Sequence, residues 1–172
     1  MMTLSSSTPV GIEARQTVPL LQQPSSNVFN GEISPDGHWL AYQSDESNQD
    51  EIYVRPFPAI NDGRWRISTG GGTQPLWARN GHELFYRHGT GVLSVPVQTT
   101  PTFRAGTPTT MFEGRYLAPP RGLAGRSYDV ASDGQRFLMI KDAPAGDSNG
   151  TPAIIVVVLN WTEELKQRVP TR

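Results

Sequence analysis

A short pattern built around a glycine recurs three times in this chain. The copies read ISPDGHWLAY around Gly37, WARNGHELFY around Gly81 and VASDGQRFLMI around Gly134. Each copy joins two apolar, β-prone runs through turn-forming residues, which is typical of a β-hairpin. The glycines lie 44 and 53 residues apart. A period of about 40–45 residues is that of a four-stranded propeller blade, so the chain is predicted to be a β-repeat protein.

The second strand of each predicted hairpin is apolar without interruption. The residues three, four and five positions after the turn glycine are Leu40, Ala41 and Tyr42, then Leu84, Phe85 and Tyr86, then Phe137, Leu138 and Met139. Successive residues of a strand point to opposite faces. These runs therefore predict sheets that are covered on both faces, as in a stack of blades, whereas a hairpin with one solvated face would alternate.

Further strands complete an all-β prediction: a β-propeller of three four-stranded blades, half of a six-bladed ring. The blades span about residues 22–68, 73–114 and 126–160. The additional strands are expected at residues 51–57, 64–68, 92–97, 109–112 and 153–159. A short C-terminal helix is predicted at residues 161–169, because residues 160–163 resemble a capping box. Residues 1–16 are predicted to be a flexible N-terminal segment, and residues 17–172 the partial propeller.

Composition excludes several classes of function. The formal net charge is −1 over 172 residues, so no basic field favours nucleic acid or an anionic membrane. The longest apolar run is far shorter than the roughly 20 residues that span a bilayer. The chain has no cysteine, which excludes disulfides, thiol catalysis and thiolate-bound zinc. The N-terminus lacks the pattern of a secretory signal, and the compartment stays open.

Several segments resemble a known family. The SPDG-x-W-L-A-Y pattern with a later IYV is similar to the TolB-type propeller repeat. The segments EIYVRPFP, ISTGGGTQPLW, GHELFYR and VVVLNWTEELKQRVP resemble, more narrowly, the C-terminal propeller of bacterial serine/threonine protein kinases. The resemblance covers about residues 17–171 and implies a scaffold fold. It implies no kinase activity here, because those relatives carry catalysis in a separate upstream domain. The second repeat departs from the pattern, with Arg79 and Asn80 in place of Pro-Asp.

Three blades alone would leave two apolar sheet faces and strand edges open to water. The last blade lacks a predicted outer strand, while residues 17–21, from Thr17 to Leu21, read as a strand that precedes the first blade. One hypothesis is a homodimer in which this strand completes the last blade of a second chain, closing a six-bladed ring. The alternative is that the chain is the back half of a longer propeller.

No enzyme motif occurs in the chain, and no cofactor or metal site is predicted. His38 and His82 share a repeat position and are expected at exposed strand starts, while His88 lies in a hairpin loop. The acidic residues Asp45, Glu46, Asp50 and Glu51 lack the spacing of a calcium loop and are expected to form a solvated hairpin.

The predicted binding surface is the set of loops at the mouth of the propeller channel. These loops carry Asn27, Asn30, Gly70, Gly71, Gly72, Gln74, Arg121 and Arg126. The triglycine could hold an anion with its backbone amides or serve only as a flexible connection. The two arginines favour an acidic or phosphorylated group, unless they serve only solubility.

The leading functional hypothesis is a non-catalytic propeller module that binds a protein or a small ligand. The alternative is a hydrolase of the esterase or peptidase type, because related propellers accompany prolyl-oligopeptidase-type peptidases. No nucleophile–base pair is recognisable for that reaction. The chain could also be a propeller fragment of a larger kinase or peptidase, or a relic with no function of its own.

Overall fold

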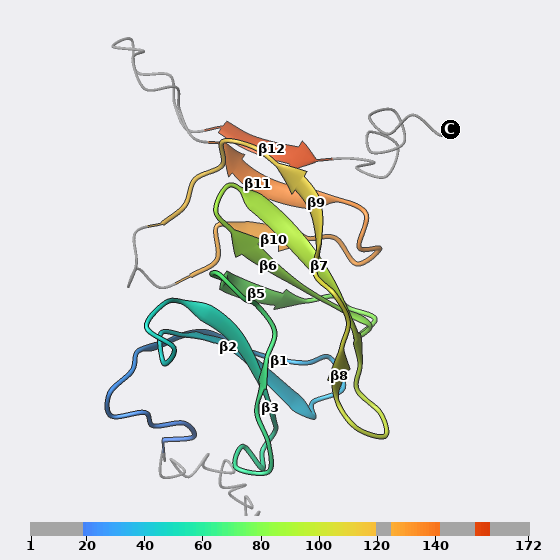
Figure 1. Cartoon of the computed structure of the whole chain (residues 1–172). Helices are drawn as coiled ribbons and strands as arrows, with labels where there is room; N and C mark the ends of the chain where they lie inside the picture. The colour runs from blue at the N-terminus through green and yellow to red at the C-terminus, as the bar shows by residue number, and fades with distance from the viewer. Residues whose placement is uncertain (1–18, 120–124, 142–153, 159–172) are drawn as a thin grey trace, which may run out of the picture.

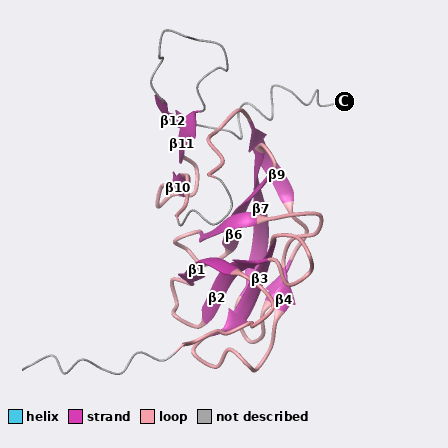
Figure 2. Ribbon diagram, turned by 90° about the vertical axis from the view of Figure 1, so that its left-hand side faces the viewer, coloured by secondary structure: helices cyan, strands magenta, loops and turns pink. Residues whose placement is uncertain are grey.

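The computed structural model describes residues 19–119, 125–141 and 154–158. These residues form three antiparallel sheets that succeed one another along the chain (Figure 1). The described residues contain no helix (Figure 2), and so none that could cross a membrane. The predicted helix at 161–169 and the predicted flexible segment at 1–16 lie outside the described residues.

The first sheet has four strands in the order β1-β2-β3-β4. Its strands are β1 (Val28–Ile33), β2 (Trp39–Ser44), β3 (Glu51–Pro56) and β4 (Trp65–Arg66). The predicted hairpin around Gly37 is therefore confirmed, and so are the two strands after it.

The second sheet repeats this order and adds one strand. Its strands are β5 (Thr73–Trp77), β6 (Glu83–His88), β7 (Gly91–Gln98), β8 (Arg104–Ala105) and β9 (Thr109–Glu113). The outer strand β9 pairs with β7, as predicted. Strand β8 was not predicted; it pairs with the last residues of the long strand β7, Val97 and Gln98.

The third sheet has three strands in the described part of the chain. These are β10 (Tyr128–Val130), β11 (Phe137–Lys141) and β12 (Ile154–Val158). A fourth strand was predicted to be missing from this repeat, and no described strand pairs with the outer edge of β12.

The three turns of the repeat have the same geometry. In each, the turn glycine has a positive φ, 76° at Gly37, 72° at Gly81 and 69° at Gly134, a conformation that glycine adopts at little cost. Each glycine amide donates to the carbonyl three residues earlier, at 2.8–2.9 Å. The departure from the repeat at Asn80 does not change the turn, because Asn80 Oδ1 accepts from the amide of His82 at 2.9 Å just as Asp36 accepts from His38 at 3.1 Å.

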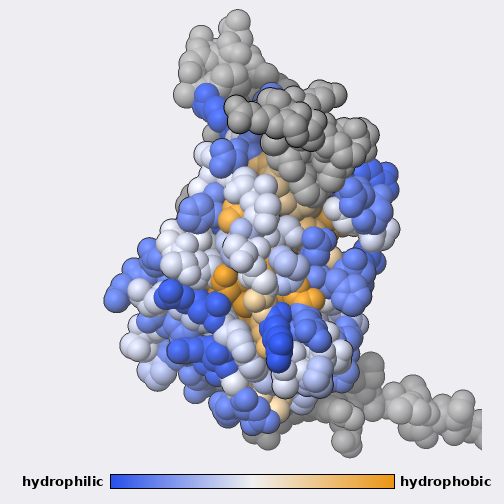
Figure 3. Space-filling view, turned by 45° about the vertical axis from the view of Figure 1, so that its right-hand side comes forward, coloured by the Kyte–Doolittle hydropathy of each residue, from blue (hydrophilic) through white to orange (hydrophobic). Residues whose placement is uncertain are grey.

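The sheets pack face to face through two apolar clusters. Between the first and second sheets lie Ala41, Ile52, Val54, Ile67, Trp77, Leu84, Tyr86, Val95, Val97 and Phe103. Between the second and third lie Leu76, Ala78, Phe85, Val92, Met111, Tyr128, Val130, Phe137 and Met139. Apolar atoms reach the surface shown in Figure 3 only in small patches among polar ones. Antiparallel meanders stacked in chain order are typical of the blades of a β-propeller.

The third repeat departs from the prediction that both faces of each sheet are covered. In the first two repeats, Ala41 and Phe85 are fully buried, but the equivalent Leu138 is 44% exposed. The reason is that the second sheet packs against the other face of the third sheet, and no described sheet packs against the face that carries Leu138.

The face of the first sheet that points away from the second is closed by its own side chains. Leu40, Tyr42, Tyr53 and Ile60 form a third cluster, with Leu21, Val28 and Phe57 packed against it. Residues 17–21 were predicted to be a strand, but the described part of this segment, residues 19–21, lies in no strand. Leu21 instead covers part of this face, and residues 17 and 18 lie outside the described part.

Candidate functional site

The triglycine connection does bind a carboxylate, but one from its own chain. The side chain of Glu51 is fully buried, and its Oε1 accepts from the amides of Gly70 at 2.9 Å and Gly71 at 3.1 Å. Its Oε2 accepts from the Ser68 hydroxyl. Positive φ values of 83° and 122° turn the two glycine amides towards the carboxylate. These amides therefore already have an internal acceptor.

The third glycine of this connection is needed for close packing. A Cβ at Gly72 would lie 2.4 Å from Ser68 Oγ and 3.0 Å from Ile52 Cγ1. The connection is thus held between the buried serine and the core of the first sheet, rather than free to adapt to a ligand.

A line of buried polar side chains, here called the polar girdle, joins the three sheets. It begins where Gln43 Oε1 accepts from Asn30 Nδ2 at 3.0 Å and from the amide of Gln74 at 3.2 Å. Gln74 Oε1 in turn accepts from the amide and the hydroxyl of Ser127, at 3.1 and 3.0 Å. The first sheet is thereby bonded to the second, and the second to the third.

Arg87 closes the polar girdle between the second and third sheets. It is 3% exposed and donates to the Ser127 hydroxyl at 3.1 Å and to the carbonyls of Leu117 and Tyr116. Burial lowers the pKa of its guanidinium. Gln43 and Arg87 each lie six residues after their turn glycine. In the first two repeats, this position therefore carries the polar side chain that bonds to the next sheet.

Residues of all three sheets line a row of adjoining hollows, here called the inner-strand groove. The inner strands β1, β5 and β10 line two of the hollows, and the third lies mainly on β10, β11 and β12. Three adjoining hollows of about 470, 390 and 620 Å³ compose it. Arg126 and Asp129 line both the first and the second hollow. Arg79, Asp129 and Val130 line both the second and the third. The hollows therefore adjoin one another through these shared residues.

Charged residues of both signs line the inner-strand groove. The Arg126 guanidinium forms an ion pair with Glu32, which links the start of the third sheet to the first. Burial raises the pKa of Glu32, and Arg126 only partly opposes this effect. Arg79 is exposed and makes no hydrogen bond or ion pair with a described residue. Its guanidinium is therefore available to a ligand where two hollows meet.

The raised pKa of Glu32 predicts a pH-dependent difference between the protein and its Glu32→Gln variant. A carboxyl whose folded pKa lies above the unfolded value of about 4.5 stabilises the fold most below that value, and this contribution is lost as the pH rises through the folded pKa. We expect the stability of the unchanged protein, relative to Glu32→Gln, to fall between pH 4.5 and pH 7. Urea unfolding at both pH values measures it.

An arginine variant serves as the control for this experiment. Arg104 is exposed on β8, and Arg104→Gln removes a charge without adding a group that titrates in this range. A Glu32→Gln difference that stays constant with pH would contradict the assignment.

The eight predicted binding residues fall into different environments. Asn30 and Arg126 both line the first hollow of the groove, while Gln74 lies beneath it in the polar girdle. Asn27 is bonded through its amide and Nδ2 to the Asp45 carboxylate, at 2.7 and 2.9 Å. Gly70 and Gly71 hold Glu51, Gly72 packs against Ser68, and Arg121 lies outside the described residues. Glu32, Arg79 and Asp129 were not singled out as binding residues from the sequence.

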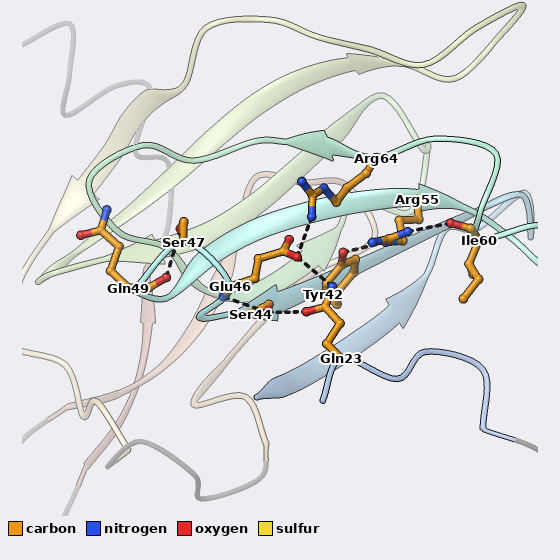
Figure 4. Close-up of polar contacts among 9 residues, drawn as sticks. All are labelled: Gln23, Tyr42, Ser44, Glu46, Ser47, Gln49, Arg55, Ile60 and Arg64. Atoms are coloured by element: carbon orange, nitrogen blue, oxygen red, sulfur yellow. Dashed lines mark hydrogen bonds and ion pairs between the residues drawn. The ribbon is translucent and has the colours of Figure 1, made fainter. Parts of the chain in front are cut away.

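The acidic hairpin of the first sheet differs from the solvated loop that was predicted. Besides the buried Glu51, Glu46 is largely buried: its Oε2 accepts from Arg64 at 2.6 Å and from Gln23 at 2.8 Å (Figure 4). Tyr42 and Arg55 lie beside them, with Arg55 Nε donating to the Tyr42 hydroxyl at 2.8 Å. This network closes the outer face of the first sheet.

The histidines do not form a nucleophile–base pair in the described part of the chain. His88 Nδ1 lies 2.8 Å from the carbonyl oxygen of Gly71. His38 Nδ1 lies 3.7 Å from Asp36 in the turn, and His82 contacts the turn of the second sheet through its backbone amide. No group of three or more metal-binding side chains occurs among the described residues.

The stacked meanders and the groove along their inner strands define the class of protein: an all-β, propeller-type segment. No protein-family model matches the chain, and no curated protein matches it. The narrower resemblance to the propellers of bacterial kinases therefore stays a prediction.

The solved structures that are similar to the chain include the two described here. The first is an oligogalacturonate lyase from Vibrio parahaemolyticus, at 14% identity and a TM-score of 0.45, covering 66% of this chain and 28% of that one. The second is TolB from Acinetobacter baumannii, at 12% identity and a TM-score of 0.37, covering 78% of this chain and 41% of that one. Both are β-propeller proteins. The chain spans less than half of either, so the assignment of the fold rests on the packing of its own sheets.

Proposed function

We propose that the chain is a non-catalytic β-propeller module whose inner-strand groove binds a protein segment or small ligand that carries an acidic group. The observation that supports this function is the position of Arg79, an exposed guanidinium without a described partner where two hollows of the groove meet. A guanidinium presents a planar fork of donors that matches a carboxylate or a phosphate.

The remaining walls of the groove fit an extended ligand better than a compact one. The groove passes across all three sheets, and apolar residues such as Ile33 and Leu76 line it between the charged ones. The Arg126–Glu32 pair adds a second charged contact on the same path. A segment that lies along the inner strands can therefore meet a cation, an ion pair and apolar surface in succession.

The resemblance to TolB-type and kinase-associated propellers supports the same proposal. Those kinases carry catalysis in a separate domain, which leaves recognition to the propeller. A propeller fold hosts many unrelated functions, so the argument for this function depends on the groove and not on the fold.

Peptide binding tests the proposal directly. A panel of acidic and phosphoserine-containing peptides, each with an uncharged analogue, is titrated against the full chain by fluorescence anisotropy. We expect acidic peptides to bind and Arg79→Ala to weaken them about tenfold or more, because a charge-assisted hydrogen bond contributes about 1.5–3 kcal/mol. Arg104→Ala, an exposed arginine outside the groove, is expected to leave binding unchanged.

Two results would contradict the proposed function. One is that charged and uncharged peptides bind equally, or that the two arginine variants lose the same affinity. The other is turnover of aryl esters or peptide anilides that disappears in His88→Ala, which would favour the hydrolase alternative.

A further inference from the structure

Asp129 lines all three hollows of the inner-strand groove. It is the central, exposed residue of β10. Its Oδ1 accepts from the neighbouring amide of Val130 at 2.9 Å, and its carboxylate forms no ion pair with a described residue. The groove therefore carries an anion that an acidic ligand bound to Arg79 leaves unused.

Most of the other charged side chains along the groove already hold a partner. Arg126 forms an ion pair with Glu32, and Arg136 pairs with a carboxylate of its own turn. Among the described lining residues, Arg79 and Asp129 are thus one cation and one anion that can each take an opposite charge from a ligand.

Asp129 begins a row of side chains that crosses the third sheet. In the register of this sheet Asp129 pairs with Leu138, and Leu138 pairs with Val157. Residues that pair directly on neighbouring strands lie on one face, and Leu138 and Val157 are 44 and 52% exposed on it. All three line the third hollow, which has a volume of about 620 Å³. This wall of the groove presents an anion followed by two apolar side chains.

The spacing of this row fits an extended peptide. Neighbouring strands are about 4.8 Å apart, so Leu138 and Val157 lie roughly 5 and 10 Å from Asp129 across the sheet. In an extended chain, side chains two positions apart point the same way and are separated by roughly 7 Å. When one side chain of a bound peptide contacts Asp129, the side chain two positions away therefore reaches the apolar pair, and the one between them points away.

We propose that the ligand is a peptide segment with an acidic residue, a basic residue and an apolar residue two positions from the basic one. The acidic side chain binds Arg79, and the basic one binds Asp129. The apolar side chain packs on Leu138 and Val157. This inference rests on the proposed function, because it specifies the ligand of the same groove. Asp129 is then the residue that selects among acidic peptides.

Matched peptides test the basic contact. Each peptide carries phosphoserine, lysine and leucine in a glycine–serine background, with the lysine and the leucine two positions apart, and is made in both chain directions. Its binding to the full chain is compared with that of the same peptide containing acetyl-lysine, which lacks the charge. We expect acetylation to weaken binding about two- to fivefold, the range for an exposed ion pair.

Three variants assign this effect to Asp129. Asp129→Asn is expected to bind the lysine and acetyl-lysine peptides equally, and Asp129→Lys to prefer a peptide with glutamate in place of the lysine. Asp62 is exposed between β3 and β4 and lines none of the three hollows, so Asp62→Asn is expected to keep the preference for lysine. A preference that persists in Asp129→Asn would overturn the proposal.

The position of the leucine tests the apolar contact. Moving the leucine by one position turns its side chain away from the sheet, and we expect the peptide to lose the affinity that leucine adds over glycine. Leu138→Ser is expected to lose the same increment. An equal gain from leucine at both positions would contradict the proposed spacing.

The same titrations separate this inference from the proposed function. Absence of any peptide binding that depends on Arg79 contradicts both. Binding that depends on Arg79 but is equal for the lysine and acetyl-lysine peptides contradicts only the ligand chemistry inferred from Asp129.

Discussion

Replacing Phe137 by alanine is expected to lower the free energy of unfolding by about 3–5 kcal/mol, the range for a buried phenylalanine. Phe137 has no exposed surface. Its ring lies edge-on to Phe85, with 5.2 Å between centroids, and makes a second edge contact with Phe112 at 5.2 Å. The three rings come from β11, β6 and β9, so the substitution removes the centre of the contact between the second and third sheets.

The neighbouring residue provides the control. Arg136 has a side chain that is 55% exposed and pairs on the surface with Asp133. Arg136→Ala is expected to change stability by no more than about 0.5 kcal/mol. Urea unfolding at one protein concentration compares the two variants. Equal losses would mean that the aromatic cluster does not hold the sheets together.

Glu51→Ala is expected to destabilise the chain by about 3 kcal/mol. The substitution removes a buried acceptor and leaves the amides of Gly70 and Gly71 and the Ser68 hydroxyl without their partner. An orphaned buried donor costs about 1–3 kcal/mol. This cost applies in full to the Ser68 hydroxyl, which is fully buried, and in part to the two amides, because Gly70 is exposed and Gly71 half-buried. The same bonds fix the connection between the first and second sheets, so hydrogen exchange at Gly70 and Gly71 is expected to rise in the variant.

Two further variants separate the carboxylate from a general effect of substitution. Glu51→Gln keeps one acceptor oxygen and is expected to lose less stability than Glu51→Ala. Glu113 is exposed at the end of β9, and Glu113→Ala is expected to be nearly neutral. Unchanged exchange at the two glycine amides in Glu51→Ala would show that another group holds this connection.

The hairpins and the stacking of sheets could be predicted because both depend on patterns within consecutive residues of the repeat. Gly37 marks a turn through four consecutive residues, and Tyr42 lies in an apolar run that only a covered sheet explains. The short strand β8 carries no such signal: its two exposed residues pair with β7 only because that strand continues to Gln98. Leu138 matches its repeat, and its exposure depends on whether another sheet packs against it, which the local pattern does not encode.

The candidate site was less predictable for the same reason. Asn30 and Arg126 stand near the starts of inner strands, which the repeat locates. The pairing of Arg126 with Glu32 joins residues 94 positions apart, and nothing in the local pattern around Glu32 marks it. Glu51 was predicted to be one member of a solvated acidic run. Its role as an acceptor could not be predicted, because it depends on the backbone path of a connection about 20 residues later.

The polar girdle has a consequence for how such a chain can change its length. Gln43 and Arg87 stand at one offset in their repeats, and each reaches the inner strand of the next sheet along the chain. A duplicated repeat therefore brings its own polar residue for this contact, while the following sheet supplies the partner, the backbone amide of Gln74 in one case and the hydroxyl of Ser127 in the other. Such a chain is therefore expected to gain or lose whole repeats more easily than single residues. Inserting or deleting one residue between Gly37 and Gln43 would remove the hydrogen bond of Gln43 to the next sheet.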